Sequence, residues 1–187
     1  MENHEDLYGL ILTGGHSSRM GTDKSLLVYN GKPQREYLFD LLGKFCQQVF
    51  TSCRKDQNVP SRLNPVVDSF NFPGPLNGIL SAFAHESRKS WLVIAVDMPF
   101  ADAQALHLLI SNRDKTKMAT CFHNAEEKQP EPLLALWERN SFPFLLKFAE
   151  NGNVSPREFL KSHPVAMINP PDEKTIVNFN YPNQILP

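Results

Sequence analysis

Short apolar runs alternate with amphipathic segments along the first 110 residues of this 187-residue chain. Residues 7–13 form an apolar run that ends in a glycine pair, which is typical of a buried strand leading into a tight loop. Residues 91–96 are apolar throughout, and this predicts a central strand that is covered on both faces. Shorter strands are predicted at 49–52 and 65–67.

In the segments between these strands, apolar residues recur at the spacing of a helix. This spacing predicts helices within 34–46, over 77–86 and over 102–111. Strands that alternate with helices in this way predict an α/β fold, with a mostly parallel central sheet and helices on both faces. Ligands of such sheets bind beyond the carboxyl ends of the strands, so the loops after residues 13 and 96 are the first candidates for a site.

The last third of the chain is expected to be less regular, because its prolines are frequent. A strand is predicted at 133–137, and residues 155–158 (SPRE) fit a capping box at the start of a helix. No internal repeat or linker is visible, and the length suits one domain. We therefore predict a single domain over residues 1–187.

Charge and cysteine usage narrow the class of protein. Nineteen basic and twenty acidic residues give a net charge of −1, which argues against broad electrostatic binding to nucleic acid or to a membrane surface. The longest wholly apolar run has six residues, too few to span a bilayer. The chain begins without a signal-peptide pattern, and its three cysteines show no CxxC spacing, so we expect a cytoplasmic protein with reduced thiols.

The loop that follows the first strand carries the most chemistry. Residues 12–24 read LTGGHSSRMGTDK, which matches neither the Walker A loop nor GxGxxG. Paired glycines let backbone N–H groups approach an anion, and Arg19 and Lys24 supply a planar cation and a point charge for phosphate oxygens. The alternative is a simple turn with two solvated cations.

Two aspartates follow predicted strands. Asp97 comes directly after the apolar run 91–96, where a carboxylate can hold Mg²⁺ together with nucleotide phosphates. The alternative role of Asp97 is to cap a turn before Pro99. Asp68 follows the predicted strand 65–67, and its alternative role is that of a turn aspartate.

The loop string as a whole resembles the (L/T)AGGxSxRMGxDK signature of nucleotidyltransferases, and the molybdenum cofactor guanylyltransferases are the most similar branch. Thr13 departs from this signature, which usually has alanine there. Further segments resemble this family in the same order: Asp68 with 72–79 (D…GPLxGI), 95–100 (CDxPF), 130–136 (EPLxAL) and 178–182 (NxNTP). The resemblance implies a Rossmann-like nucleotidyltransferase fold.

This resemblance also implies an activity. It is the transfer of GMP from GTP to the terminal phosphate of molybdopterin, with Mg²⁺ as cofactor and release of pyrophosphate. GTP, molybdopterin and cofactor-inserting proteins are the implied partners. The implied catalytic residues are Arg19, Lys24 and Asp97. The implied nucleotide-binding residues are Leu12, Thr13, Gly14, Gly15, Lys24, Asp68 and Asp97, and the implied metal ligands are Asp97 and Asn180.

Several alternatives stay open at this point. A cytidylyltransferase for the same cofactor is one, although its loop resembles AAG, and the pair Gly14-Gly15 favours GTP. A transferase for another phosphorylated acceptor is the second, and a non-catalytic nucleotide- or cofactor-binding module is the third. Asn180 has its own alternative, a C-terminal loop that binds no ligand.

Overall fold

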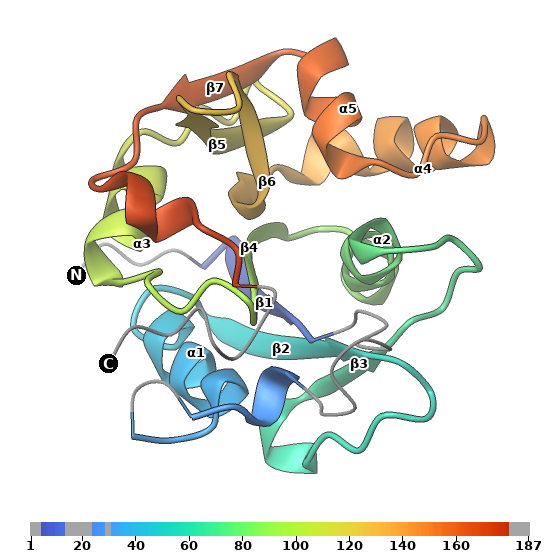
Figure 1. The fold of residues 1–187 in the computed structure, drawn as a ribbon. Helices are drawn as coiled ribbons and strands as arrows, with labels where there is room; N and C mark the ends of the chain where they lie inside the picture. The colour runs from blue at the N-terminus through green and yellow to red at the C-terminus, as the bar shows by residue number, and fades with distance from the viewer. Residues whose placement is uncertain (1–4, 14–23, 29–30, 180–187) are drawn as a thin grey trace.

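A seven-stranded mixed sheet forms the centre of the computed structural model, which describes residues 5–13, 24–28 and 31–179 (Figure 1). The strand order is β3-β2-β1-β4-β6-β5-β7. Neighbours among β1–β4 pair in parallel, as do β5 and β7, whereas β6 is antiparallel to both β4 and β5. The strands are β1 (Leu7–Leu12), β2 (Gln48–Cys53), β3 (Pro65–Val67), β4 (Ser90–Ala95), β5 (Ala119–Asn124), β6 (Gln129–Trp137) and β7 (Val165–Ile168).

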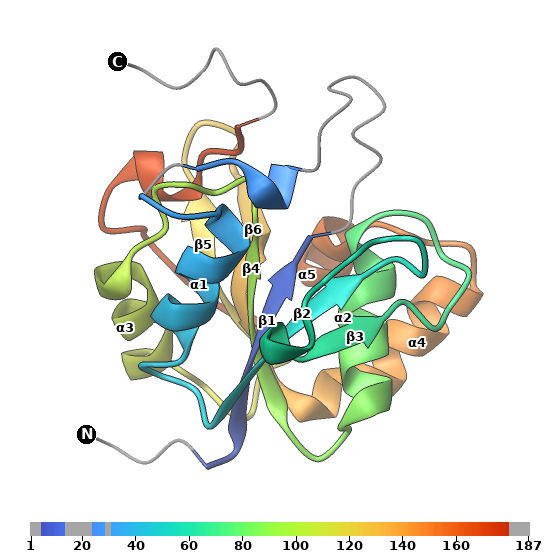
Figure 2. The ribbon, with the colours of Figure 1, turned by 90° about the horizontal axis from the view of Figure 1, so that it is seen from below.

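Helices cover both faces of this sheet. Figures 1 and 2 show α1 and α3 on one face, and α2, α4 and α5 on the other. The predicted α/β class, with most strand pairs parallel, is therefore confirmed. The helices are α1 (Gln34–Leu42), α2 (Pro75–His85), α3 (Ala103–Ser111), α4 (Phe142–Glu150) and α5 (Pro156–Ser162), with single 3-10 turns at η1 (Lys24–Leu26), η2 (Ser61–Leu63), η3 (Arg139–Ser141) and η4 (Glu173–Ile176).

Local sequence explains where these elements lie. All six residues of β1 and all six of β4 are buried, as expected for central strands between two helical layers. The carboxylate of Asp102 caps α3 by accepting from the Ala105 N–H, and the Ser155 hydroxyl caps α5. The helix predicted at 77–86 begins earlier, at Pro75, because proline suits the first turn of a helix.

The prediction of a less regular last third is wrong. This part of the chain contains β6, the longest strand described, together with α4, α5 and β7. Its prolines are tolerated because Pro130 lies where β6 pairs with β5 alone, and Pro132 lies where the pairing register between β5 and β6 shifts. None of the helices described is both long enough and apolar enough to cross a membrane.

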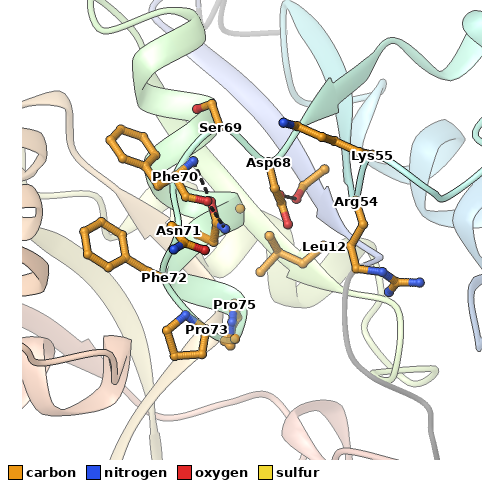
Figure 3. A pocket seen from close by; sticks show the side chains of 14 residues that line it. Leu12, Arg54, Lys55, Asp68, Ser69, Phe70, Asn71, Phe72, Pro73 and Pro75 are labelled. Carbon is orange, nitrogen blue, oxygen red and sulfur yellow. Dashed lines mark hydrogen bonds between the residues drawn. The ribbon is translucent and has the colours of Figure 1, made fainter.

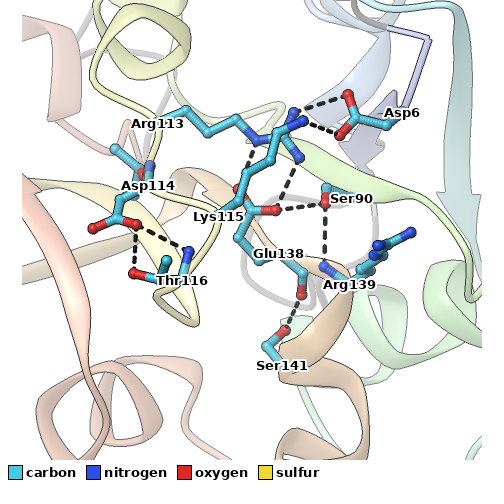
Figure 4. A network of polar contacts seen from close by, with 10 residues as sticks. Asp6, Ser90, Arg113, Asp114, Lys115, Thr116, Glu138, Arg139 and Ser141 are labelled. Atoms are coloured by element: carbon cyan, nitrogen blue, oxygen red, sulfur yellow. Dashed lines mark hydrogen bonds and ion pairs between the residues drawn. The ribbon is translucent and has the colours of Figure 1, made fainter.

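A buried ionic network joins the strands at the end of the sheet opposite to the carboxyl ends of β1 and β4 (Figure 4). The Arg113 guanidinium donates to both carboxylate oxygens of Glu138, at 2.6 and 2.9 Å, and to Asp6 Oδ1 at 3.0 Å. The Ser90 hydroxyl, at the start of β4, also donates to Glu138, at 2.7 Å. Burial alone would raise the pKa of Asp6, but hydrogen bonds from Lys115 and Arg113 lower it to about 2. The network therefore ties the beginnings of β1 and β4 to the end of β6.

Candidate nucleotide and metal site

Asp97 lies two residues beyond the carboxyl end of β4, beside the end of β1. The Val96 N–H donates to the carbonyl of Leu12 at 3.1 Å, so the two chain segments stay paired as they leave the sheet. Asp97 Oδ1 is buried and has no hydrogen-bond partner within the described part of the chain. Burial raises the pKa of Asp97, and the nearby positive charge of Lys24 opposes this shift. A buried carboxylate oxygen without a partner needs a cation or a proton to compensate its charge.

The structure brings Lys24 close to Asp97. Lys24 begins η1, and its ammonium donates to the carbonyl of Phe179 at 3.3 Å. The N–H of the same Phe179 donates to the carbonyl of Asp97 at 2.7 Å. Residues near the two ends of the described chain therefore meet at the carboxyl end of the central strands.

The donor set around Asp97 fits a magnesium ion. Mg²⁺ binds through one or two carboxylates and completes its shell with water and phosphate oxygens, so one unpartnered carboxylate oxygen is sufficient. Asn178 Oδ1, next to Phe179, is a second buried oxygen without a described hydrogen-bond partner. Groups of three or more His, Cys, Asp or Glu side chains, which would indicate an all-protein metal site, do not occur among the described residues.

A cavity of about 690 Å³ opens on the β2–β3 side of this centre (Figure 3). It is lined by the ends of β1 and β2, by the segment that follows β3 and by the first turn of α2. Its volume falls in the range of pockets that bind small molecules and cofactors, about 300–1,000 Å³. Leu12 and Asp68, two of the predicted nucleotide-binding residues, lie in its wall.

Asp68 is fixed within this cavity by contacts to β2. Its N–H donates to the carbonyl of Cys53 at 2.9 Å, and its Oδ1 accepts from the Ser52 hydroxyl at 3.0 Å. Figure 3 shows its carboxylate beside Leu12. Burial raises the pKa of Asp68, while the Ser52 hydrogen bond and the Arg54 charge act in the opposite direction. The Asp68 side chain is therefore held against β2 in the wall of the cavity and is not simply solvated.

Ser52 is a residue that the sequence analysis missed. Its hydroxyl holds Asp68, and its carbonyl accepts from the Thr13 hydroxyl at 2.6 Å. A Cβ atom at Gly78 would lie 2.5 Å from the Ser52 hydroxyl oxygen and 2.7 Å from Leu12 Cδ2, so only glycine leaves this arrangement intact. The position of Ser52 near the carboxyl end of β2 was the available signal.

Thr13, which departs from the family signature, has a role of its own. Besides its bond to Ser52, its hydroxyl oxygen lies 3.2 Å from Gln57 Oε1. The alanine that is usual at this position has no such hydroxyl. The threonine is therefore accommodated, and it ties the start of the glycine loop to β2.

Four predicted site residues are not placed by the structure. Gly14, Gly15, Arg19 and Asn180 lie outside the described residues. Their roles stay predictions.

Glu131 is a second residue that the sequence analysis did not assign to the site. It is 1 % exposed, accepts from the Leu133 N–H at 2.8 Å and pairs with Arg157 at 3.3 Å. Burial is the main cause that raises the pKa of Glu131 to about 7; the Leu133 N–H and Arg157 act in the opposite direction, and the negative charge of Asp97 adds to the rise. Arg157 also pairs with Glu127 at 2.7 Å, so two carboxylates offset a cation in the first turn of α5.

Comparisons with known proteins agree with this arrangement. Residues 9–167 match the model of the MobA-like NTP transferase domain. The chain is 36 % identical, over 94 % of its length, to a molybdenum cofactor biosynthesis bifunctional protein of Synechocystis, of which it spans 52 %. It is 30 % identical to a molybdenum cofactor guanylyltransferase of Vibrio vulnificus, over 77 % of this chain and 74 % of that protein.

The fold is also found in a solved structure. The crystal structure of molybdopterin-guanine dinucleotide biosynthesis protein A from Archaeoglobus fulgidus superposes with a TM-score of 0.77 at 23 % identity, covering 94 % of this chain and 93 % of that one. A match to a family model over most of the chain, together with a relative of 30 % identity covered over about three quarters of its length, shows the family. This chain belongs to the family of MobA-like NTP transferase domains.

Proposed function

We propose that this chain transfers GMP from GTP to the terminal phosphate of molybdopterin, with Mg²⁺ as cofactor and pyrophosphate as the second product. The observation that carries the proposal is the meeting of Lys24 and Asp97 at the carboxyl end of β1 and β4, beside a cavity of nucleotide size. The family match and the guanylyltransferase relatives support the same reaction. Delivery of the product to cofactor-inserting proteins stays a prediction.

The cavity suits the nucleoside part of GTP. Leu12 and Asp68 line it, and Thr13 follows Leu12 directly in the chain. Ser52 forms hydrogen bonds to both Thr13 and Asp68 and fixes them in place. The triphosphate then extends toward Lys24 and Asp97, across the end of β1. Gly14, Gly15 and Arg19 are the proposed partners of its oxygens through backbone N–H groups and a guanidinium.

The reaction requires positioning and charge neutralisation more than proton transfer. The attacking group is a phosphate that is already anionic at neutral pH, so no general base is needed. Lys24 neutralises phosphate charge and stays oriented through its bond to Phe179. Asp97, with Asn180, would hold the Mg²⁺, which when bound supplies charge stabilisation at the α-phosphate. Alignment of the two phosphates for an in-line attack accounts for the rest of the rate.

An assay with GTP labelled at its α-phosphate tests this proposal. Incubation with molybdopterin and Mg²⁺ is expected to move the label into a dinucleotide, and chelation of the metal is expected to stop the transfer. Transfer to another phosphorylated acceptor, with none to molybdopterin, would support the second alternative. Nucleotide binding without any transfer would support the binding-module alternative.

Substitution of Lys24 is expected to weaken the use of GTP. Lys24→Ala removes one charge-assisted contact, worth about 1.5–3 kcal/mol, so kcat/KM should fall roughly ten- to a hundredfold. The melting temperature should stay close to that of the wild type, because the bond from the Lys24 ammonium to the Phe179 carbonyl, at 3.3 Å, is long for a hydrogen bond. Lys161→Ala, which removes an exposed partner of Glu158 on α5, is the matched control. An unchanged kcat/KM for Lys24→Ala would contradict the phosphate role of this residue.

A further inference from the structure

Phe100 is an exposed aromatic residue in an otherwise buried turn. It lies three residues after Asp97, and 47 % of its surface is open to solvent, although Met98 and Ala101 on either side of it are buried. The turn itself is fixed by hydrogen bonds, because the Met98 N–H donates to Ala95 and the Ala101 N–H donates to Met98. The ring is therefore held in a defined place rather than on a loose loop.

A second aromatic ring joins Phe100 to the catalytic centre. The rings of Phe100 and Phe179 pack edge to face, with centroids 5.3 Å apart and planes at 76°. An edge-to-face pair leaves at least one face of each ring uncovered by the other. The backbone of Phe179 is bonded to both Asp97 and Lys24, as described above. The aromatic pair is thus fixed to the two residues that we propose to act on the phosphates.

The position of the pair complements that of the nucleotide cavity. The cavity lies over the ends of β3, β2 and β1, whereas Phe100 belongs to the connection from β4 to α3. Figures 1 and 2 show α2, which opens onto the cavity, and α3 on opposite faces of the sheet. Asp97 follows β4, the strand next to β1 in the sheet, and precedes Phe100 in the same connection. An in-line transfer needs the donor nucleotide on one side of the reacting phosphorus and the acceptor on the other.

We infer that the open face of Phe100 binds the planar ring system of the acceptor by stacking, an inference that rests on the proposed function. A pterin is a flat, polar heterocycle, and such rings stack on aromatic side chains as nucleobases do. The three residues from Asp97 to Phe100 span at most about 11 Å. A ring joined to its phosphate by a short linkage can therefore lie on Phe100 while the phosphate lies at Asp97 and Lys24.

Equilibrium dialysis of metal-free molybdopterin against the full chain tests this inference without turnover. It is carried out with Mg²⁺, both alone and with a GTP analogue whose α–β bridge cannot be cleaved. Phe100→Ala is expected to raise the Kd for molybdopterin about tenfold, a loss typical of one stacking contact. Phe100→Tyr should retain the wild-type Kd, and Phe100→Leu, which keeps apolar bulk without an aromatic face, should resemble Phe100→Ala.

Two controls separate stacking from indirect effects. Phe144→Ala removes another half-exposed phenylalanine, on α4, and should leave the Kd unchanged. The Kd for the GTP analogue should change less than twofold in all Phe100 variants, which shows that Lys24 and Asp97 stay in place.

The outcomes distinguish this inference from the proposed function. Binding that depends on Phe100, without any GMP transfer by the wild type, would support stacking and contradict the proposed function. GMP transfer with a Kd for molybdopterin that is equal in wild type, Phe100→Ala and Phe100→Leu would overturn stacking alone. No binding of molybdopterin by the wild type, with or without the nucleotide analogue, would also overturn it.

Discussion

Asp97→Asn is expected to lower kcat/KM for GMP transfer about a thousandfold, because it removes the carboxylate charge that we propose to hold Mg²⁺. Charge stabilisation by a metal is worth several kcal/mol, and each 1.4 kcal/mol corresponds to about a factor of ten. The free energy of unfolding should stay equal or rise, since burial of the charged form of this carboxylate is unfavourable. Steady-state kinetics and thermal unfolding on one preparation measure both quantities.

The same chemical change nearby provides the control. Asp102 caps α3 in the same connection after β4, and asparagine caps helices about as well as aspartate. Asp102→Asn should therefore keep both activity and stability. If Asp97 only capped a turn, Asp97→Asn would behave like Asp102→Asn and keep both its activity and its stability, which would contradict the metal role.

Arg113→Met is expected to produce the largest loss of stability, about 3–5 kcal/mol. It removes the guanidinium that donates to both oxygens of Glu138, and the side chain of Glu138 is only 3 % exposed. A buried carboxylate would then lack its cation. A loss of this size lowers the melting temperature by roughly 10 °C in a chain of this length. Urea unfolding, with the midpoint and slope compared between variants, measures the effect.

A double substitution identifies the cause of this loss. Arg113→Met with Glu138→Gln removes the unpaired charge but keeps an acceptor for Ser90, so it should be less destabilised than Arg113→Met alone. Lys115→Met, which removes an exposed partner of Asp6, should cost less than about 1 kcal/mol. Equal losses for Arg113→Met and Lys115→Met would show that the buried network does not stabilise the sheet.

The pattern of apolar residues in the sequence was sufficient to predict the central strands and the helices that follow them. The runs that became β1 and β4 are almost entirely apolar, because both of their faces are covered, and only Ser90 at the start of β4 is polar. The strand β7 was missed, because its apolar run has only four residues and none of them is buried. The antiparallel direction of β6 was also missed, since an apolar run does not encode the direction of its neighbours.

The candidate site could be predicted where its residues are part of a motif. Lys24, Asp68 and Asp97 were proposed from the sequence, and the structure places each of them at the carboxyl end of the sheet. Ser52 and Glu131 were not proposed, because their roles depend on contacts distant in the sequence. Ser52 meets Thr13 from 39 positions away, and the effect of Asp97 on Glu131 crosses from β4 to β6.

Competition between GTP and CTP tests the central claim, guanylyl transfer, most directly. A site that pairs the N1–H, the N2 amine and the O6 of guanine leaves polar groups unmatched when cytosine enters, at about 1–3 kcal/mol for each buried group. With both nucleotides present at matched Mg²⁺ and limiting molybdopterin, kcat/KM for GTP should exceed that for CTP by about ten- to a hundredfold. Equal or faster transfer from CTP would contradict the guanylyltransferase assignment and place the chain with the cytidylyltransferases.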